Sequence, residues 1–571
     1  MDKKTIAIVV VLVAVLIFYF QIMEFLGFYT PAPPQPAEQP AVDTTTQVVT
    51  QQPVQTETVQ PPGTAPTEII TDTAVIAEQL ETHDSIIVIT DKYTVTLSTF
   101  GGGPVSMLLN EYFYRDENRI EMLPGAARVT PEIKFAGGQF STSDVSFESS
   151  MAPGNYRVGN NPLEITYTYT ATGEAQIKKK FVFYPGEYHY DFTLEVYGLQ
   201  DFGFDRLYNL AWNTPLGVTE PQPKTDYEAM EAVAMQGGSR VTLDDFDDGR
   251  LDQSLTGSTS WAGLRSKYFA SVMIPKNRPG ESVFARGEKR PITFEDDEVE
   301  QRLITVGLDM PFTGISAAFV DSFTVFVGPL DYTLLSDYNA GLEDMLGIGT
   351  TPYVGWIIKP FAVAIIWLLP RMYSAIPNYG IVIILFALLV KLITMPLSMK
   401  SFKSMNAMKE LQPKIEEMKK KHKKNPQALN QEMMKMYKAH GVNPMSGCLP
   451  ILPQMPLFFA LFSVFRSTIL LRGAPFVWFI DDLSVGASGL MDPYIVLVVI
   501  MIGAQFISQT LTMPSTQQNK MLMYIMPLFM GFIFYSFPAG LVLYWTCFSV
   551  FSLIDYFAFK RGKKNAEVKV A

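Results

Sequence analysis

Long apolar runs and short alternating runs divide the 571-residue chain into regions of unlike character. An apolar run follows two lysines at the N-terminus and continues to about residue 28, and residues 29–80 are rich in Pro, Thr, Gln, Val and Ala. Residues 81–340 alternate between apolar and polar positions over short stretches, whereas residues 376–560 return to long apolar runs. The pattern predicts a multi-domain membrane protein, in which a polytopic helical core carries a large β domain.

The N-terminal apolar run, residues 1–28, is long enough for one membrane crossing, because a helix rises about 1.5 Å per residue and the hydrocarbon core is about 30 Å thick. A secretory signal peptide is the alternative. No small-x-small cleavage site follows closely and Glu24 interrupts the exit of the run, so we expect an uncleaved transmembrane anchor. Residues 29–80 cannot bury enough apolar surface to offset their ordering entropy, and we expect a disordered tether.

Segments rich in β-branched and aromatic residues fill residues 81–340, and turn residues separate them. The clearest segments are Ile86–Ile89, Tyr93–Leu97, Ile165–Tyr169, Lys179–Tyr184 and Tyr190–Val196. Three glycines and a proline at residues 101–104 are a strong turn signal. Because no helical period is sustained here, we expect a large antiparallel β-sandwich.

Five apolar spans near the C-terminus predict a five-helix core within residues 376–560. The spans cover about residues 378–395, 448–470, 494–511, 521–537 and 538–559. Residues 341–375 precede them and are interpreted as a linker and an interfacial amphipathic helix, because lysine, arginine and two prolines interrupt the apolar run. Residues 397–440, between the first two spans, predict a helical hairpin that breaks near Pro426.

The charge distribution predicts the topology. Residues 400–440 contain eleven Lys and four Glu, whereas residues 472–492 contain three Asp and one Arg. Residues 561–571 form a basic tail. Because basic loops stay in the cytoplasm, we expect six crossings with both termini and the hairpin inside, and with the β domain and the acidic loop outside.

Lys391 lies in the first span of the helical core, near the inner end of that span. A cation at the centre of a membrane helix costs at least about 2.5–3.5 kcal/mol unless it reaches water, a partner or the interface. Snorkelling to the cytoplasmic headgroups is one outcome, since Lys391 lies about one turn from the end of the span. A polar site inside the core is the other outcome.

Polar side chains in the other spans favour a site inside the core. They are Gln454, Gln505, Ser508, Gln509, Thr546 and Ser549. The three from residues 494–511 recur at i, i+3 and i+4 and therefore share one helix face. Because polar groups are costly in lipid, we expect these side chains to point inward. They would form hydrogen bonds in a sealed bundle or surround a cation in a water-filled groove, and the sequence leaves both arrangements open.

The hairpin combines lysines with methionines. Its candidate contact residues are Lys414, Lys419, Lys420, Lys421, Met418 and Met433. Methionine supplies adaptable apolar surface, and clustered lysines attract anions. The hairpin could therefore meet nascent hydrophobic segments, anionic lipid or ribosomal RNA. In the alternative, the methionines only pack the hairpin and the lysines only solvate it.

The sequence lacks the motifs of common catalytic and cofactor sites, such as a phosphate loop, a G-x-S-x-G elbow or a zinc-binding H-E-x-x-H helix. Its four histidines have no metal-ligand spacing, and both cysteines lie in apolar spans. We therefore expect neither an enzyme nor a cofactor. A polytopic transporter and a membrane-anchored receptor that uses the outer β domain are the alternative classes. A single intramembrane cation, no inverted repeat and no paired acidic residue speak against the transporter.

Ordered motifs over residues 356–560 resemble the YidC membrane protein insertase family. They include Leu411–Ile415 (LQPKI), Gln431–Met434 (QEMM), Val442–Pro450 (VNPMSGCLP), Gln454–Pro456 (QMP), Asp492–Tyr494 (DPY) and Phe537–Trp545 (FPAGLVLYW). The resemblance implies a five-helix core that encloses a hydrophilic groove. The large β domain is similar to the periplasmic sandwich of the Gram-negative form of the family.

The same resemblance implies roles for individual residues. Lys391 takes the position of a groove cation that is usually Arg, and it keeps the charge but loses the planar guanidinium fork. Gln454 falls at a groove position. Tyr544 and Trp545 fall in the region of the last helix that contacts substrate.

By resemblance, the chain inserts nascent membrane proteins into the bacterial inner membrane and helps them fold. It is expected to act alone or with the Sec translocon and the accessory subunits of that translocon. The short basic tail predicts weak or transient contact with the ribosome, and the lysine-rich hairpin predicts contact with anionic lipids. No DNA partner is expected.

Overall fold

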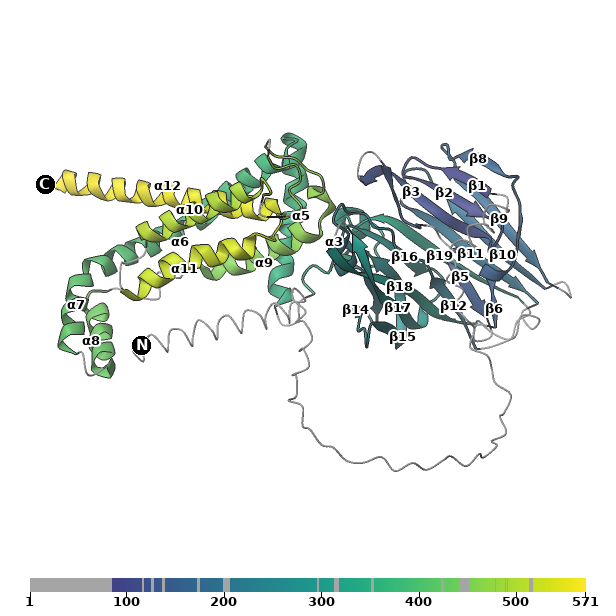
Figure 1. Ribbon diagram of the computed structural model, residues 1–571, viewed down its shortest axis with the longest axis horizontal. Helices are drawn as coiled ribbons and strands as arrows, with labels where there is room; N and C mark the ends of the chain where they lie inside the picture. Colours follow the sequence, from purple (N-terminus) through teal and green to yellow (C-terminus); the bar gives the residue numbers. More distant parts are fainter. Residues whose placement is uncertain are drawn as a thin grey trace, which may run out of the picture. The chain divides into compact units, whose positions relative to one another are not determined.

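The computed structural model describes residues 85–570 apart from short gaps. The gaps are residues 115–117, 125–127, 136–138, 172–174, 199–205, 295–296, 313–317, 351–353, 423–425, 442–450, 478, 488, 490 and 513–516. The expected anchor (residues 1–28) and tether (residues 29–80) lie outside the described residues. A β domain occupies residues 85–329, and helices dominate from residue 332 onward (Figure 1).

Two β-sheets build the β domain (Figure 1). The smaller sheet has the order β4-β3-β2-β1-β8, with β1 (Ser85–Ile89), β2 (Tyr93–Ser98), β3 (Gly103–Tyr114), β4 (Asn118–Glu121) and β8 (Gly154–Arg157). Neighbouring strands of this sheet are antiparallel except β1 and β8, which are parallel.

The larger sheet has the order β6-β5-β12-β18-β17-β15-β16-β19-β11-β10-β9-β7, and β13 joins β14 to β15. Its strands are β5 (Glu132–Phe135), β6 (Phe140–Ser141), β7 (Glu148–Ser149), β9 (Leu163–Thr170), β10 (Gln176–Phe183), β11 (His189–Tyr197), β12 (Leu207–Trp212), β13 (Glu231–Gln236), β14 (Ser239–Leu243), β15 (Arg250–Arg265), β16 (Phe269–Pro275), β17 (Gly280–Phe294), β18 (Asp297–Pro311) and β19 (Ala318–Pro329).

Strict alternation along the strands sends one face of each sheet into a shared core. Along β10 every second residue is buried. Phe181 of β10 is in register with Phe192 of β11, which is in register with Phe323 of β19, and successive ring centres lie 5.3 and 5.8 Å apart. From the other sheet, the Tyr93 hydroxyl donates a hydrogen bond of 3.3 Å to the carbonyl of His189. The predicted β-sandwich is confirmed.

The glycine turn between β2 and β3 depends on a left-handed backbone. The φ angles of Gly101 and Gly102 are 81° and 59°, a region that other residues rarely occupy. A Cβ atom on Gly101 would lie only 2.8 Å from Cβ of Val129. Both conformation and space therefore require glycine at residue 101.

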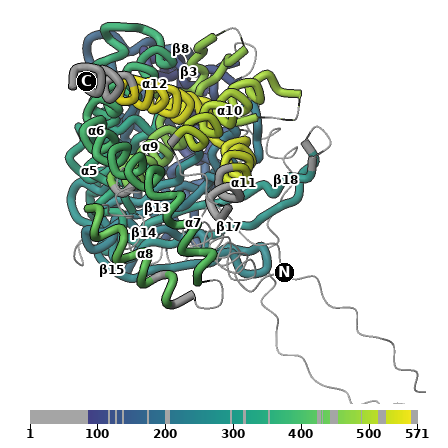
Figure 2. The backbone as a smooth tube through the Cα atoms, turned by 90° about the vertical axis from the view of Figure 1, so that its left-hand side faces the viewer, coloured from purple at the N-terminus to yellow at the C-terminus, as the bar shows by residue number. Residues whose placement is uncertain are grey.

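Helices form the remainder of the described chain. Short helices are η2 (Thr142–Asp144), α3 (Pro223–Ala229), α4 (Tyr332–Ser336), η4 (Leu342–Leu346) and η6 (Ile469–Leu471). The helical core contains α5 (Gly355–Ala375), α6 (Tyr379–Glu410), α7 (Gln412–Lys421), α8 (Pro426–Ala439), α9 (Ile451–Ser467), α10 (Ile495–Thr512), α11 (Gln517–Phe534) and α12 (Ala539–Val570). The helices α6, α10 and α12 pack side by side (Figures 1 and 2).

Three helices are long and apolar enough to cross a membrane: Gly355–Ala375, Tyr379–Glu410 and Ala539–Lys560. Shorter apolar helices cover Ile495–Leu511 and Tyr524–Phe534. The first of the three is α5, so the interfacial position that the sequence suggested for it stays a prediction.

Two helices extend beyond the apolar runs that predict them. The helix α6 continues past residue 395, where the first span was expected to end, and stops at Glu410. Pro413 stands at the start of α7, and because proline lacks an N–H and clashes with the preceding turn, it favours a break before it. The part of the predicted hairpin before Pro426 is therefore divided between the end of α6 and α7. At the other end, α12 continues through the predicted basic tail.

The helices α6 and α12 run parallel. Phe386 of α6 packs on Tyr544 of α12 with ring centres 6.0 Å apart. Further along both helices, Phe402 packs on Tyr556 and Phe559 at 5.8 and 6.2 Å. Contacts thus advance in the same direction along both helices, as expected for two spans that cross a membrane with the same orientation.

Candidate functional site

Lys391 of α6 points into the interface with α12. Its side chain is 5% exposed, and its amine lies 3.2 Å from Oδ2 of Asp555, whose side chain is 13% exposed. The amine also donates a hydrogen bond of 3.0 Å to Oγ of Ser552 and lies 4.9 Å from the centre of the Phe548 ring. The three partners follow one another at i, i+4 and i+7 and therefore share one face of α12. The amine is therefore held by protein groups of α12 rather than exposed at the protein surface.

Ser552 is oriented for this contact. Its hydroxyl donates a hydrogen bond of 2.8 Å to the carbonyl of Phe548, so that the lone pairs of the oxygen remain available to the amine of Lys391. A buried charge is tolerated when it is paired and hydrogen-bonded. Asp555 supplies the opposite charge, and Ser552 supplies a neutral acceptor.

The sequence-based expectation of no paired acidic residue in the spans was wrong. Asp555 is the one charged residue between Ala539 and Phe559, and the fold places it beside Lys391, although the two residues are 164 positions apart in the sequence. A lone acid in an apolar span opposite a lone base in another span was the available signal. The transporter class loses one argument against it.

The remaining candidate residues lie on neighbouring helices. Nε1 of Trp545 donates a hydrogen bond of 3.2 Å to Oε1 of Gln505, so two of the candidate groove residues join α12 to α10. Gln454 of α9 is half-buried, as is Ser508 of α10. Tyr544 is almost fully buried.

Two of these polar groups are buried without a hydrogen-bond partner among the described residues. They are Oε1 of Gln509 and the hydroxyl of Tyr544. Buried polar atoms in proteins are almost always paired with protein or water, because an unpaired one costs about 1–3 kcal/mol. Water is the usual partner of such atoms in proteins.

The hairpin of α7 and α8 packs through the methionines. Leu411 and Ile415 form its buried centre, and Met418 and Met433 pack against them. The four candidate lysines of the hairpin, Lys414, Lys419, Lys420 and Lys421, are exposed. Among the candidate residues, methionines therefore hold the hairpin together and lysines form its surface. This arrangement agrees with the alternative in which the methionines only pack the hairpin and the lysines only solvate it. It is equally compatible with a cationic contact surface.

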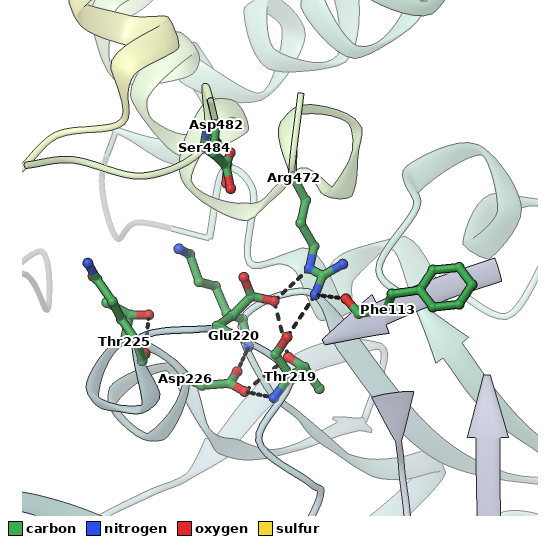
Figure 3. Close-up of polar contacts among 10 residues, drawn as sticks. Phe113, Thr219, Glu220, Thr225, Asp226, Arg472, Asp482 and Ser484 are labelled. Atoms are coloured by element: carbon green, nitrogen blue, oxygen red, sulfur yellow. Dashed lines mark hydrogen bonds and ion pairs between the residues drawn. The ribbon is translucent and has the colours of Figure 1, made fainter. Parts of the chain in front are cut away.

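A second buried ion pair joins the β domain to the segment between α9 and α10 (Figure 3). Nε of Arg472 donates to Oε1 of Glu220 at 2.7 Å. Nη2 donates to the carbonyls of Thr219 and Phe113 at 2.7 and 3.0 Å. The side chains of Arg472 and Glu220 are 13% and 3% exposed. We call these four residues the outer joint.

The carboxylate of Asp226 fixes the backbone of the outer joint. It accepts hydrogen bonds from the amide of Thr219 at 2.6 Å and from the amide of Lys267 at 3.1 Å (Figure 3). Burial raises the pKa of Glu220, and the Arg472 guanidinium opposes that rise. Burial also lowers the pKa of Lys267, and the nearby carboxylates oppose that change. No local pattern predicts this joint, because Arg472 and Glu220 are 252 positions apart in the sequence.

Comparisons with known proteins agree with this division of the chain. The sequence pattern of the family described as 60Kd inner membrane protein matches residues 371–567, and that of the YidC periplasmic domain matches residues 85–364. The Chlorobaculum tepidum membrane protein insertase YidC is 32% identical over 83% of this chain and 81% of its own length. The Syntrophus aciditrophicus membrane protein insertase YidC is 30% identical over 97% of this chain and 98% of its own length.

A solved structure titled as an active YidC insertase with its first transmembrane domain resolved aligns with 85% of this chain and 98% of its own length, at 20% identity and a TM-score of 0.35. The sequence matches, in contrast, extend over both domains at 30% identity or more.

Fold and sequence together define a multi-domain protein of the inner membrane, with a helical core and a periplasmic β-sandwich. The chain belongs to the YidC membrane protein insertase family.

Proposed function

We propose that this chain inserts nascent membrane proteins into the inner membrane, with Lys391 at the centre of the substrate path. The observation that carries the proposal is the amine of Lys391, buried among apolar helices beside Asp555. A hydrophilic substrate segment is costly to move into hydrocarbon. A cation at this depth lowers that cost for a segment that carries a carboxylate, because opposite charges attract strongly where the dielectric constant is low.

The remaining candidate residues would line a hydrophilic groove around Lys391. They are Gln454, Gln505, Ser508, Gln509, Tyr544 and Trp545. The unpartnered atoms of Gln509 and Tyr544 support this groove, since water or a passing polar segment would satisfy them. Oε1 of Gln505 already accepts a hydrogen bond from Nε1 of Trp545, and a polar substrate segment would compete for this donor and this acceptor.

Apolar burial would drive the release of substrate. The hydrophobic part of a substrate would slide along the lipid-facing side of the helices and partition into the bilayer, which is favourable by about 0.8 kcal/mol per buried CH₂ group. This step needs no nucleotide and no catalytic group. The chain is therefore proposed to act as an insertase and chaperone rather than as an enzyme.

The proposed topology has six crossings and both termini in the cytoplasm. The parallel arrangement of α6 and α12 supports it, and so does the lysine excess of the hairpin. In this orientation the exposed hairpin lysines face anionic lipid and, transiently, the ribosome. The Sec translocon would cooperate on larger substrates.

Reconstitution tests the proposed function. The full chain would be placed in lipid vesicles, and insertion of single-span substrates with neutral or acidic translocated tails would be measured by protease protection. Lys391→Gln should lower insertion of the acidic tail about tenfold, or 1.4 kcal/mol, and lower that of the neutral tail less. Lys403→Gln is the matched control, because Lys403 is an exposed lysine of the same helix. Equal losses for both tails would contradict the proposed role of Lys391.

A further inference from the structure

We propose that Asp555 is a specificity-determining residue: it occupies Lys391 in the empty protein and sets how acidic a translocated segment must be to engage that cation. The proposal rests on the proposed function, because it assumes that substrate reaches Lys391. It adds a competitor that belongs to the protein itself.

The geometry of the pair supports this competition. The Asp555 carboxylate lies 3.2 Å from the Lys391 amine, the position that a substrate carboxylate would need for the same ion pair. The neutral contacts of the amine, with Ser552 and the Phe548 ring, do not compete with a carboxylate for charge. A substrate carboxylate must therefore displace the Asp555 carboxylate from the Lys391 amine or bind the amine beside it.

The location of Asp555 along the membrane normal gives it a second effect. Lys391 lies 12 residues after the start of α6, and Asp555 lies 16 residues after the start of α12. At about 1.5 Å per residue, the two backbone positions lie about 18 and 24 Å along their own helices, and the side chains reach toward each other until the charged atoms are 3.2 Å apart. In the proposed topology, an acidic segment that reaches Lys391 from the cytoplasm therefore meets the charge of Asp555 at the same depth. Like charges repel, so a weakly acidic segment is disfavoured.

The thermodynamic consequence is a minimum number of acidic residues that a translocated segment needs in order to engage Lys391. The pair stabilises the empty protein, and a substrate with one carboxylate exchanges one ion pair for another with little gain. A segment with several carboxylates has more ways to form an ion pair with Lys391. Its additional negative charges also strengthen the attraction to that cation. Without Asp555, Lys391 has no ion-pair partner in the protein without substrate. A single substrate carboxylate then supplies that partner.

Four proteins test this proposal in one cycle: the unchanged chain, Asp555→Asn, Lys391→Gln and the double variant. Each full chain is reconstituted in vesicles and supplied with one single-span substrate whose translocated tail carries zero, one, two or three acidic residues. The measured quantity is the insertion yield of each acidic tail divided by that of the neutral tail. This ratio cancels losses of active protein that affect all tails alike.

The expected order of the ratio is Asp555→Asn, then the unchanged chain, then the double variant, then Lys391→Gln. For the tail with one acidic residue, Asp555→Asn should raise the ratio about fivefold or more, as expected for close charge pairs with limited solvent access. The double variant should show no preference for acidic tails. Lys391→Gln leaves Asp555 unpaired and should reject acidic tails.

Controls separate this role from a purely structural one. Asp555→Glu keeps the charge and should keep the ratio of the unchanged chain, whereas Ser552→Ala removes only the neutral acceptor and should change the ratio little. If all four proteins of the cycle give the same ratio, Asp555 is a structural partner and the proposal is wrong while insertion itself stands. If the unchanged chain inserts neither acidic nor neutral tails, the proposed function fails, and the role of Asp555 fails with it.

Discussion

Two buried cations in this protein, Arg472 and Lys391, differ in the kind of partner that holds them. Arg472 at the outer joint donates to the carboxylate of Glu220 and to two backbone carbonyls. Among the described residues, the amine of Lys391 in the helical core has its polar and ring contacts with side chains of α12, which are a carboxylate, a hydroxyl and an aromatic ring. The carbonyl of Phe113 belongs to β3, and the backbone of Thr219 is held by Asp226, so neither carbonyl moves without a change in the backbone, whereas side chains can change rotamer.

The chemistry of the two cations matches this difference. The planar guanidinium of Arg472 has donors in fixed directions, which suits a permanent connection between distant segments. The ammonium of Lys391 has three donors on a flexible stem and can exchange partners without a change in the backbone. The outer joint therefore has a structural role, since it connects two distant segments permanently. The Lys391 site is suited to partners that bind transiently.

The strongest test of this comparison is the removal of one member of the outer joint. Arg472→Met leaves Glu220 buried without its partner, and the cost should be about 3–5 kcal/mol. The amide of Thr219, which donates to Asp226, is a local reporter, and its hydrogen exchange should accelerate. Exchange rates of the full chain in detergent would be measured by mass spectrometry. An Arg472→Met/Glu220→Met double variant should recover part of the loss, because no charge then stays unpaired.

Unchanged exchange at Thr219 in Arg472→Met would contradict the comparison, since the outer joint would then contribute nothing to local stability. The variant Arg206→Met is the matched control. Arg206 forms an exposed ion pair with Glu281, and such pairs contribute about 1 kcal/mol or less.

A third buried cation, Lys179 of β10, sharpens the comparison because it has no ion pair among the described residues. Its amine donates a hydrogen bond of 2.9 Å to the carbonyl of Gly101 and lies 5.4 Å from the centre of the Phe147 ring. Burial lowers the pKa of Lys179 to about 7, and Glu132 only partly opposes this change. The folded β domain therefore binds this proton more weakly than the unfolded chain does.

The sign of the pH effect follows. Between pH 7 and the unfolded pKa of about 10.4, the unfolded chain holds more protons at this lysine, so stability rises with pH by up to about 1.4 kcal/mol per pH unit. Below pH 7 the full penalty is present. Lys179→Met should remove this rise and stabilise the domain near neutral pH. Hydrogen exchange of β9 to β11 at several pH values, corrected for intrinsic rates, would measure the difference.

Lys178→Met provides the control, because Lys178 lies on the other face of the same strand and the variant loses the same formal charge. A pH slope that survives in Lys179→Met, or disappears equally in Lys178→Met, would show that burial of this amine is not its cause.

Local patterns predicted the elements of the protein well. The alternation in residues 93–97, 165–169 and 190–196 identified strands whose observed ends differ by at most two residues, since one buried face imposes a period of two. Apolar runs located α9 to α12 for a similar reason. They missed the ends of α6 and α12, because hydropathy reports where apolar surroundings end, and Lys, Met and Glu continue a helix readily.

Long-range pairing explains what the sequence could not predict at the candidate site. Lys391 and Gln505 were identified individually because polar groups are rare and costly in apolar helices, and Trp545 was identified by the family resemblance. Their partners depend on how the helices rotate against one another, and no local period encodes that rotation. The ion pair with Asp555 and the hydrogen bond between Gln505 and Trp545 therefore appear only in the fold.

The smallest expected effect tests the neutral hydrogen bond between Trp545 of α12 and Gln505 of α10. Trp545→Phe keeps an aromatic ring against Phe458 and Phe534, whose ring centres lie 5.3 and 5.6 Å away, but it removes the donor to Gln505. Thermal unfolding of the full chain should report a loss of about 1 kcal/mol. If substrate competes for Gln505, this variant should also bind polar segments at least as well as the unchanged chain, because the amide oxygen is already free. A variant that loses insertion of every substrate without losing stability would instead make the Trp545 donor part of the path, and the side chains of α12 would then be fixed contacts rather than exchangeable ones.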